Sequence, residues 1–124
     1  MTIDHAYECG EGWRPMVTKL DEKLRTLSPR YEIQQIKEKF GTLRFYAKYV
    51  AEDGASPLTR EIFYDLIVAA EANSSTVCEE CGRSAYLRKD LGWFKTLCAE
   101  CYVKRKPRKT TASGAMDVAP WEDR

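Results

Sequence analysis

Long apolar runs, net charge and histidine are all scarce in this sequence of 124 residues. No apolar run approaches the roughly eighteen residues that suggest a membrane-spanning helix, so we expect no contact with a membrane. The start of the chain carries no secretory signal pattern, which favours a cytoplasmic location. A net charge of +1 excludes a global positive field that would draw the whole chain onto nucleic acid.

Cysteine is plentiful instead, and four of the five cysteines follow one regular pattern. Cys78, Cys81, Cys98 and Cys101 form a C-x2-C-x16-C-x2-C motif, in which each pair can bring two thiolates round one ion. Four sulfur ligands suit tetrahedral zinc, and a site with four thiolates has no open position for a reacting water. We therefore predict one structural Zn²⁺ at these cysteines. Disulfides and a reactive thiol pair are the alternatives, and a reducing cytoplasm favours the metal over both.

The residues between and after the cysteines predict a small ββα zinc finger over residues 77–109. Residues 85–88 and 93–97 are short extended candidates, and residues 89–92 are the turn between them. The second cysteine pair opens a helical run that Pro107 ends. This order of knuckle, hairpin and helix resembles a treble-clef zinc finger, and a zinc ribbon is the alternative. Treble clefs have many functions, but the nuclease members need histidines that this segment lacks, so we expect no cleavage activity.

Residues 1–76 predict an α-β-β-α domain, which together with the finger makes the fold class α+β. Apolar residues recur at three- and four-residue steps over residues 13–27, as in an amphipathic helix. A second helix begins at Pro57 with Ser56 as its N-cap, and we expect the finger to dock on the two helices. The predicted apolar stripe of the second helix comprises Leu58, Ile62, Phe63, Leu66, Ala69 and Ala70.

Two antiparallel strands are predicted between the helices, over residues 31–50, with their turn at Lys39-Phe40-Gly41. Pairing Glu38 with Thr42 puts most apolar residues on the face toward the helices. The opposite face is a candidate for binding a partner protein through Gln34, Arg44 and Tyr46. The alternative is that this face is an ordinary solvated surface. The residues predicted on that face are Glu32, Gln34, Ile36, Arg44, Tyr46 and Lys48.

Two further motifs give little support to catalysis. Gln35-Ile36-Lys37 resembles a variant of the restriction-nuclease motif, but no preceding strand with an acidic metal ligand is recognisable. His5 and Cys9 lack a third group to orient them, so we interpret them as a surface histidine and a free thiol. The sequence therefore predicts a protein that is not an enzyme.

Positive charge is concentrated in the finger. Residues 77–109 hold nine Lys and Arg against four Asp and Glu, whereas residues 1–76 hold ten against twelve. Such a patch could contact phosphates, and Trp93, Phe94 and Tyr102 could stack on bases. The alternative is that the charges complement the end of the helix and the aromatic residues cover the zinc core. The candidate phosphate contacts are Arg88, Lys89, Lys95, Lys104, Arg105, Lys106, Arg108 and Lys109.

Three stretches carry a resemblance to a family of small bacterial and phage proteins without an established activity. They are Gly10-Glu-Gly-Trp13, the hairpin segment QIKEKFGTLRFY over residues 35–46, and Gly92-Trp-Phe-Lys-Thr-Leu-Cys98. The family shares a Gly-Trp near the start, a KEKFGxLRFY hairpin and a cysteine-bearing C-terminal segment. The resemblance covers most of residues 9–101 and implies a mobile-element or prophage role, in which small proteins often act by occupying a host protein.

Two functions follow from these features. The leading one is a non-enzymatic zinc protein that binds nucleic acid through the basic finger helix. The alternative is a phage-type inhibitor or adaptor that binds a host protein through the hairpin face. Residues 110–124 are predicted to be disordered, and Trp121 within them could act as a short docking peptide because it has no core to fill.

Overall fold

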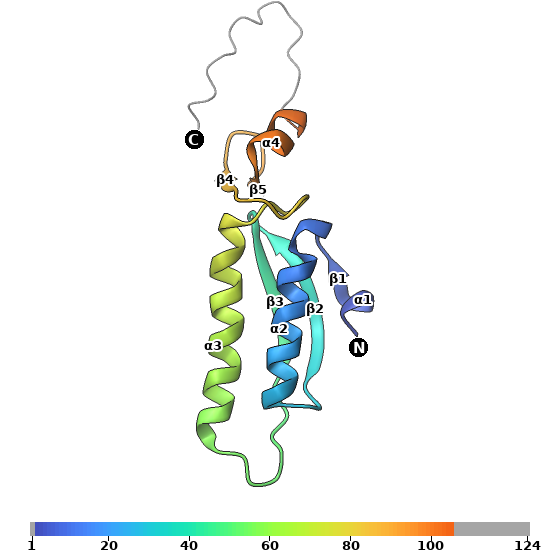
Figure 1. Ribbon diagram of the computed structural model, residues 1–124, viewed down its shortest axis with the longest axis vertical. Coiled ribbons are helices and arrows are strands. Elements are labelled where there is room, and N and C mark those ends of the chain that lie inside the picture. Colours follow the sequence, from blue (N-terminus) through green and yellow to red (C-terminus); the bar gives the residue numbers. More distant parts are fainter. Residues whose placement is uncertain (1, 106–124) are drawn as a thin grey trace, which may run out of the picture.

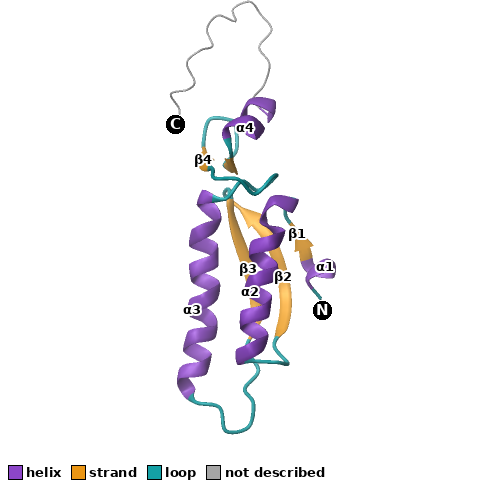
Figure 2. Cartoon of the chain, viewed as in Figure 1, coloured by secondary structure: helices purple, strands orange, loops and turns teal. Residues whose placement is uncertain are grey.

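The structure, a computed structural model, describes residues 2–105; the predictions made for Lys106, Arg108, Lys109 and Trp121 lie outside the described residues. It combines helices with two small sheets, so the predicted α+β class is confirmed (Figure 1; Figure 2). In chain order the elements are α1 (Ile3–Ala6), β1 (Tyr7–Glu8), the 3-10 turn η1 (Glu11–Trp13), α2 (Arg14–Leu27), β2 (Glu32–Lys39), β3 (Thr42–Lys48), α3 (Pro57–Asn73), the 3-10 turn η2 (Ser74–Thr76), β4 (Tyr86–Arg88), β5 (Lys95–Leu97) and α4 (Ala99–Arg105).

Helices α2 and α3 lie side by side across one face of the sheet that contains β2 and β3 (Figure 1). Helix α2 carries Pro15 in its first turn, where the missing N–H costs no hydrogen bond, and it buries Val17 and Leu20. Helix α3 starts at the predicted cap, because Ser56 Oγ accepts a hydrogen bond from Leu58 N at 3.1 Å. Both helices begin where their local signals predict.

The buried face of α3 differs from the predicted stripe. Phe63 and Ile67 are its buried residues, whereas Leu58 and Ile62 are 62% and 47% exposed. Apolar residues occur on most sides of this helix, so periodicity alone does not select the face that packs. Phe63 is fully buried and makes edge-on ring contacts with Tyr31, Tyr49 and Tyr64.

The first sheet has the order β1-β2-β3, with β1 parallel to β2 and β2 antiparallel to β3. Strand β3 is therefore an edge strand, and α3 with η2 covers its free N–H groups. Leu43 N donates to Ser74 Oγ and Phe45 N donates to Glu71 Oε2, each at 2.9 Å. These bonds satisfy buried backbone donors and fix the end of α3 against the sheet.

The turn between β2 and β3 is tighter than predicted. Glu38 pairs with Leu43 rather than with Thr42, so Phe40 and Gly41 alone form the turn. Both have positive φ, 55° and 85°, as a two-residue turn of the primed type requires. The turn of three residues, Lys39-Phe40-Gly41, that was expected from the sequence is therefore wrong.

An irregularity in β2 between Ile33 and Gln35 offsets this shift, and beyond it Glu32 pairs with Lys48 as predicted. The side-chain period of a strand is two, so a shift of one residue exchanges the faces. Ile36, predicted on the solvated face, is consequently turned inward and is fully buried. That assignment of Ile36 is corrected by the structure.

The second sheet pairs β4 with β5 and forms, with α4, a small unit that we call the finger. The finger lies at the end of the molecule where α2 begins, α3 ends and β2 turns into β3 (Figure 1). Its strands are shorter than predicted, and α4 begins at Ala99. The finger has its own buried cluster, separate from the cluster of the α/β part, consisting of Cys78, Ala85, Leu91, Leu97, Cys98, Cys101 and Tyr102.

Candidate metal centre

The four predicted zinc ligands converge within the finger. The Sγ atoms of Cys78, Cys81, Cys98 and Cys101 all lie within 4.8 Å of one another. In a tetrahedral site with Zn–S bonds of about 2.3 Å, neighbouring sulfur atoms stand about 3.8 Å apart. The distance of 3.5 Å between Cys81 Sγ and Cys98 Sγ is close to this value, and the described cysteines are all free thiols. The cluster can therefore hold a metal ion, and its four sulfur donors suit zinc.

A tight turn of backbone brings the first two thiols together. Cys78 N donates to Arg83 O at 2.8 Å, and Gly82 N donates to Cys78 O at 2.9 Å. Gly82, directly after the second ligand, has a φ of 87°, which glycine adopts without steric cost. The glycine therefore allows the chain to reverse immediately after Cys81.

The second pair lies at the start of α4. Cys98 precedes the helix and Cys101 is in its first turn, so their three-residue spacing places both on one side. Cys101 N donates to Cys98 Sγ at 3.4 Å, and Tyr102 N donates to Cys98 O at 2.9 Å. Cys98 thus satisfies backbone donors of the first helical turn while presenting its sulfur to the cluster.

The clustered thiols differ in acidity. Burial raises the pKa of the Cys101 thiol, and its hydrogen bonds to Cys98 and Cys78 raise it further. Burial also acts to raise the pKa of Cys98, but the Cys101 N–H and the neighbouring thiols outweigh it and bring the pKa to about 7. Cys98 therefore ionises more readily than Cys101. Metal ligation needs thiolates, so binding of a metal would release protons.

Two glycines of the N-terminal segment lie directly against the first cysteine turn. Gly12 N donates to Glu79 O at 2.7 Å, and Gly10 N donates to Glu79 Oε2 at 2.8 Å. A Cβ atom on Gly12 would stand 2.2 Å from Cys78 O, and one on Gly10 would stand 2.4 Å from Glu79 O. No other residue fits these positions without displacing the finger. Trp13 adds a third bond, from Nε1 to Val77 O at 2.7 Å.

The β2–β3 turn makes the second contact with the finger. Thr96 Oγ1 donates to Gly41 O at 2.7 Å, and both groups are buried. A Cβ atom on Gly41 would stand 2.4 Å from Leu87 Cδ1. The finger therefore docks on η1, on the hairpin turn and on η2, the turn that continues the end of α3, rather than along the two helices as expected. Sequence reasoning missed this role, and the only signal for it is the glycine pattern of Gly10-Glu-Gly-Trp13 and Phe40-Gly41.

The candidate phosphate contacts occupy different environments. Arg88 is only 8% exposed, its Nε donates to Leu97 O at 3.1 Å, and its guanidinium carbon lies 4.3 Å from the centre of the Tyr102 ring. Such burial goes against a phosphate contact for Arg88, which instead belongs to the finger core. Burial could not be read from the sequence because the arginine lies on a strand of three residues.

Ion pairs engage two further cations of this set. Lys95 Nζ lies 2.7 Å from Glu79 Oε1, with side chains only 15% and 5% exposed, and Arg105 pairs with Glu80. Lys89 and Lys104 are exposed and form no ion pair within residues 2–105. Of the described candidates, Lys89 and Lys104 are thus the ones whose charge is not paired with a carboxylate of residues 2–105.

The hairpin residues proposed for partner binding lie on the sheet face opposite α2 and α3. Tyr46 is 40% exposed and Gln34 is exposed beside the strand irregularity. Arg44 is half-buried, because its Nη1 donates to Thr42 Oγ1 at 2.7 Å and to Leu43 O at 3.0 Å.

Strand β1 is the strand before β2 that the sequence analysis did not recognise. In the register of the parallel pair, Glu8 of β1 lies beside Lys37 of β2. Within residues 2–105, however, the four cysteines are the only group of three or more His, Cys, Asp or Glu side chains placed to share a metal. His5 is exposed and Cys9 is half-buried. Burial, together with the nearby Glu79 carboxylate, raises the pKa of the Cys9 thiol to about 12.

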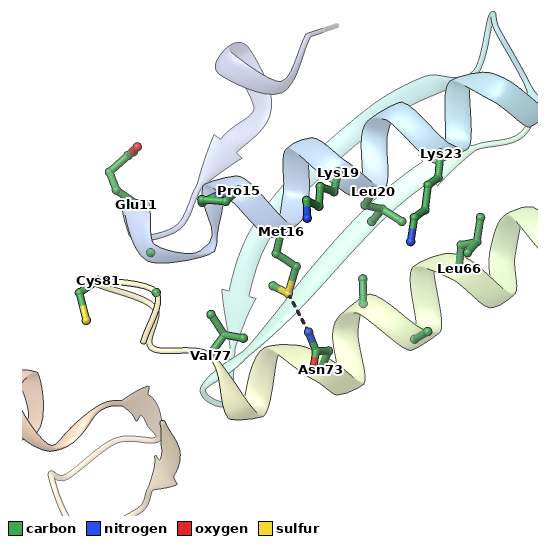
Figure 3. A pocket seen from close by; sticks show the side chains of 14 residues that line it. Glu11, Pro15, Met16, Lys19, Leu20, Lys23, Leu66, Asn73, Val77 and Cys81 are labelled. Atoms are coloured by element: carbon green, nitrogen blue, oxygen red, sulfur yellow. Dashed lines mark hydrogen bonds between the residues drawn. The ribbon is translucent and has the colours of Figure 1, made fainter. Parts of the chain in front are cut away.

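An open groove of about 730 Å³ runs between α2 and α3 and ends at the first cysteine turn (Figure 3). Met16, Leu20 and Leu66 line it with apolar groups, and Lys19 and Lys23 reach along α2. The sequence analysis assigned Leu66, Ala69 and Ala70 to the core, and the structure places these residues along the groove.

Comparisons with known proteins give no match: no protein-family model, no curated protein and no solved structure matches this chain. Within residues 2–105, no helix combines the length and the apolar character needed to cross a bilayer. The functional conclusion therefore rests on the cysteine cluster and on the surfaces beside it.

Proposed function

We propose that the protein is a non-enzymatic zinc protein in which Cys78, Cys81, Cys98 and Cys101 hold one structural Zn²⁺. The convergence of four sulfur atoms within 4.8 Å is the observation that supports it most directly. The order of the elements, with one pair on a backbone turn, a hairpin, and the second pair at the start of a helix, supports a treble-clef-type finger. An ion with four thiolates has no position for a substrate, so its role is to stabilise the finger.

The proposed activity is nucleic-acid binding through the basic segment that begins in α4. This helix lies at the far end of the molecule from the loop between β3 and α3 (Figure 1), and Lys104 in its last turn is exposed. The sequence continues with Lys106, Arg108 and Lys109, so the charged residues of this short stretch are all positive. Polyanion binding needs such a local excess of cations, and Lys89 adds to it from the finger loop.

Salt-dependent binding tests this proposal. Labelled single- and double-stranded DNA and RNA are titrated with zinc-loaded protein, beside a variant with Lys104, Lys106 and Lys109 changed to glutamine. The matched control changes Lys19, Lys23 and Lys48 to glutamine, an equal loss of charge on exposed positions of α2 and β3.

We expect the log–log salt slope of duplex binding to become shallower by about 0.9 for each phosphate that is no longer neutralised, and only in the first variant. No binding by the parent at low salt, or equal slopes in both variants, would overturn the proposal.

A second candidate is protein binding through the open sheet face, as a phage-type inhibitor or adaptor would use it. The exposure of Gln34 and Tyr46 on the sheet face opposite α2 and α3 favours it. Complex formation that survives moderate salt and is lost on Tyr46→Ala would support this function, because aromatic anchors rather than exposed charges would then carry the affinity.

A further inference from the structure

Exposed aromatic residues gather where the β2–β3 turn meets the finger. Phe40 is 64% exposed at the tip of the turn, and Phe94 is 40% exposed in the loop before β5. Their ring centres are 6.4 Å apart, with the ring planes at 61°. We call these two residues the aromatic pair; Trp93, next to it in the chain, is 49% exposed.

The fold fixes the pair in place although neither ring is buried. Phe40 has a φ of 55° and is the one residue other than glycine with positive φ within residues 2–105. Large side chains rarely adopt this conformation, so the surrounding structure must impose it. The contacts of Gly41 do so, because its backbone presses against Leu87 and its carbonyl accepts the Thr96 hydroxyl at 2.7 Å. The aromatic pair is therefore a preorganised surface.

Two lysines flank the pair. Lys39 Nζ lies 5.7 Å from the centre of the Phe40 ring, and Lys89 Nζ lies 5.8 Å from the centre of the Phe94 ring. Neither ammonium forms an ion pair with a carboxylate of residues 2–105. The patch therefore offers two aromatic rings and two positive charges that no carboxylate of residues 2–105 pairs.

The carboxylates around this surface are already engaged. Glu38 accepts a hydrogen bond from Gly41 N at 2.7 Å, and Glu79 accepts one from Lys95 Nζ at 2.7 Å. Asp90, next to Lys89, is hydrogen-bonded to the Tyr102 hydroxyl. Their charges lower the local positive potential, but none of them neutralises Lys39 or Lys89 by direct contact.

We propose that the aromatic pair with Lys39 and Lys89 binds single-stranded nucleic acid. Bases would stack on the Phe40 and Phe94 rings while the lysines contact neighbouring phosphates, the combination that single-strand binding surfaces use. A duplex keeps its bases stacked on each other and offers none to exposed rings. The inference rests on the proposed nucleic-acid function and narrows it to single strands and to a surface outside the basic segment.

Fluorescence anisotropy with labelled oligothymidylate, single-stranded RNA and duplex DNA tests the inference. The main variant is Phe40→Leu with Phe94→Leu, which keeps apolar side chains and removes the rings. Its controls are Phe40→Tyr with Phe94→Tyr, which keeps the rings, and Leu58→Ala, which alters an equally exposed residue of α3 (62%). Zinc content and circular dichroism establish that every variant is folded.

Loss of stacking on one ring weakens single-strand binding by about five- to 150-fold, so the double leucine variant should lose at least that much. Both controls should stay within about twofold of the parent, since rings and patch remain intact in them. Changing Lys39 and Lys89 to glutamine should make the salt slope on single strands shallower by about 1.4.

The outcomes separate the two proposals. If the parent binds and the basic-segment variant is weakened, but the leucine variant binds like Leu58→Ala, the aromatic pair is excluded and the proposed function stands. If the leucine variant loses single-strand binding while the basic-segment variant keeps it, the pair is supported and the basic segment is not. A parent that binds no nucleic acid overturns both.

Discussion

The α/β part and the finger are stabilised in different ways. The buried cluster of the first part contains thirteen apolar residues, drawn from α1, η1, α2, both long strands and α3. The cluster of the finger contains seven residues, and three of these are cysteines. Small units with few buried apolar groups need a metal or disulfides to fold. The finger would thus depend on the metal ion proposed for its four cysteines, whereas the α/β part has a core of its own.

We call the contacts of η1 and the β2–β3 turn with the finger the junction. Gly10, Gly12 and Gly41 approach the finger closely there and are hydrogen-bonded to it, and Trp13 donates from Nε1 to Val77 O. Such contacts require both partners to be folded. Loss of the metal should therefore destabilise the contacts at the junction and leave the core of the α/β part folded.

The largest effect is expected from Cys98→Ser. The hydroxyl is a poor zinc ligand, so we expect loss of stoichiometric zinc and unfolding of the finger, because structural zinc contributes about 10 kcal/mol or more in small zinc domains. Hydrogen exchange should show loss of protection in β4, β5 and α4, while α2 and α3 keep theirs. Zinc content by mass spectrometry and exchange by segment are the measurements.

Phe63→Ala is the reciprocal change. It removes a fully buried ring that contacts three tyrosines, so it should cost about 3–5 kcal/mol of the free energy of unfolding of the α/β part. Zinc should stay bound below the unfolding transition. If Cys98→Ser instead unfolds the whole chain and Phe63→Ala releases zinc under native conditions, the two parts form one cooperative unit.

The next effect concerns the junction. Gly12→Ala would put a Cβ atom 2.2 Å from Cys78 O, and the finger must shift to relieve the clash. We expect a loss of about 1–3 kcal/mol together with faster release of zinc to a chelator. Chemical denaturation and chelator competition measure the two quantities.

Gly54→Ala is the matched control for Gly12→Ala. Gly54 has a φ of 80° and no atom within 4 Å of an added Cβ, so its replacement costs only backbone strain, about 1–2 kcal/mol. Zinc release should then be as in the parent. Equal zinc release in both glycine variants would mean that the junction does not support the metal centre.

The cysteine cluster was predictable because the pattern that defines it is local in the sequence. Ligand spacing alone defines the cysteine motif, and caps and apolar periodicity define α2 and the start of α3. The reversal of Ile36 was not predictable, because it depends on a tight turn at Phe40 and on an irregularity near Gln34 that offset each other. The sequence pattern was interpreted with one register along the whole length of β2 and β3.

The roles of Gly10, Gly12 and Arg88 were also hidden. Gly12 must be a glycine because the backbone of Cys78 and Glu79 lies directly against it. These residues are more than sixty positions away in the sequence, so nothing near Gly12 in the sequence indicates the contact. From the sequence, Arg88 is expected on the surface, but in the fold it is buried and its guanidinium lies over the Tyr102 ring. In both cases the finger fixes the role, so the sequence around each residue could not show it.

The smallest effect concerns Cys9, the cysteine outside the finger. Its pKa of about 12 means that about one thiol in ten thousand is ionised at pH 8, and the thiolate is the reactive form. In zinc-loaded protein at pH 8 we therefore expect very slow alkylation of Cys9 by iodoacetamide, with the rate rising about tenfold per pH unit up to the pKa. Peptide mapping by mass spectrometry gives the rate for each cysteine.

Chelation makes Cys9 a reporter of the comparison between the two parts. Burial in the α/β part is the main cause of its raised pKa, and the Glu79 carboxylate of the finger is the second. After zinc removal the finger thiols should react quickly, while Cys9 should accelerate only modestly because burial persists and only Glu79 moves away. Rapid labelling of Cys9 on chelation would show that the α/β part opens together with the finger, and rapid labelling with zinc bound would contradict the buried position of the thiol.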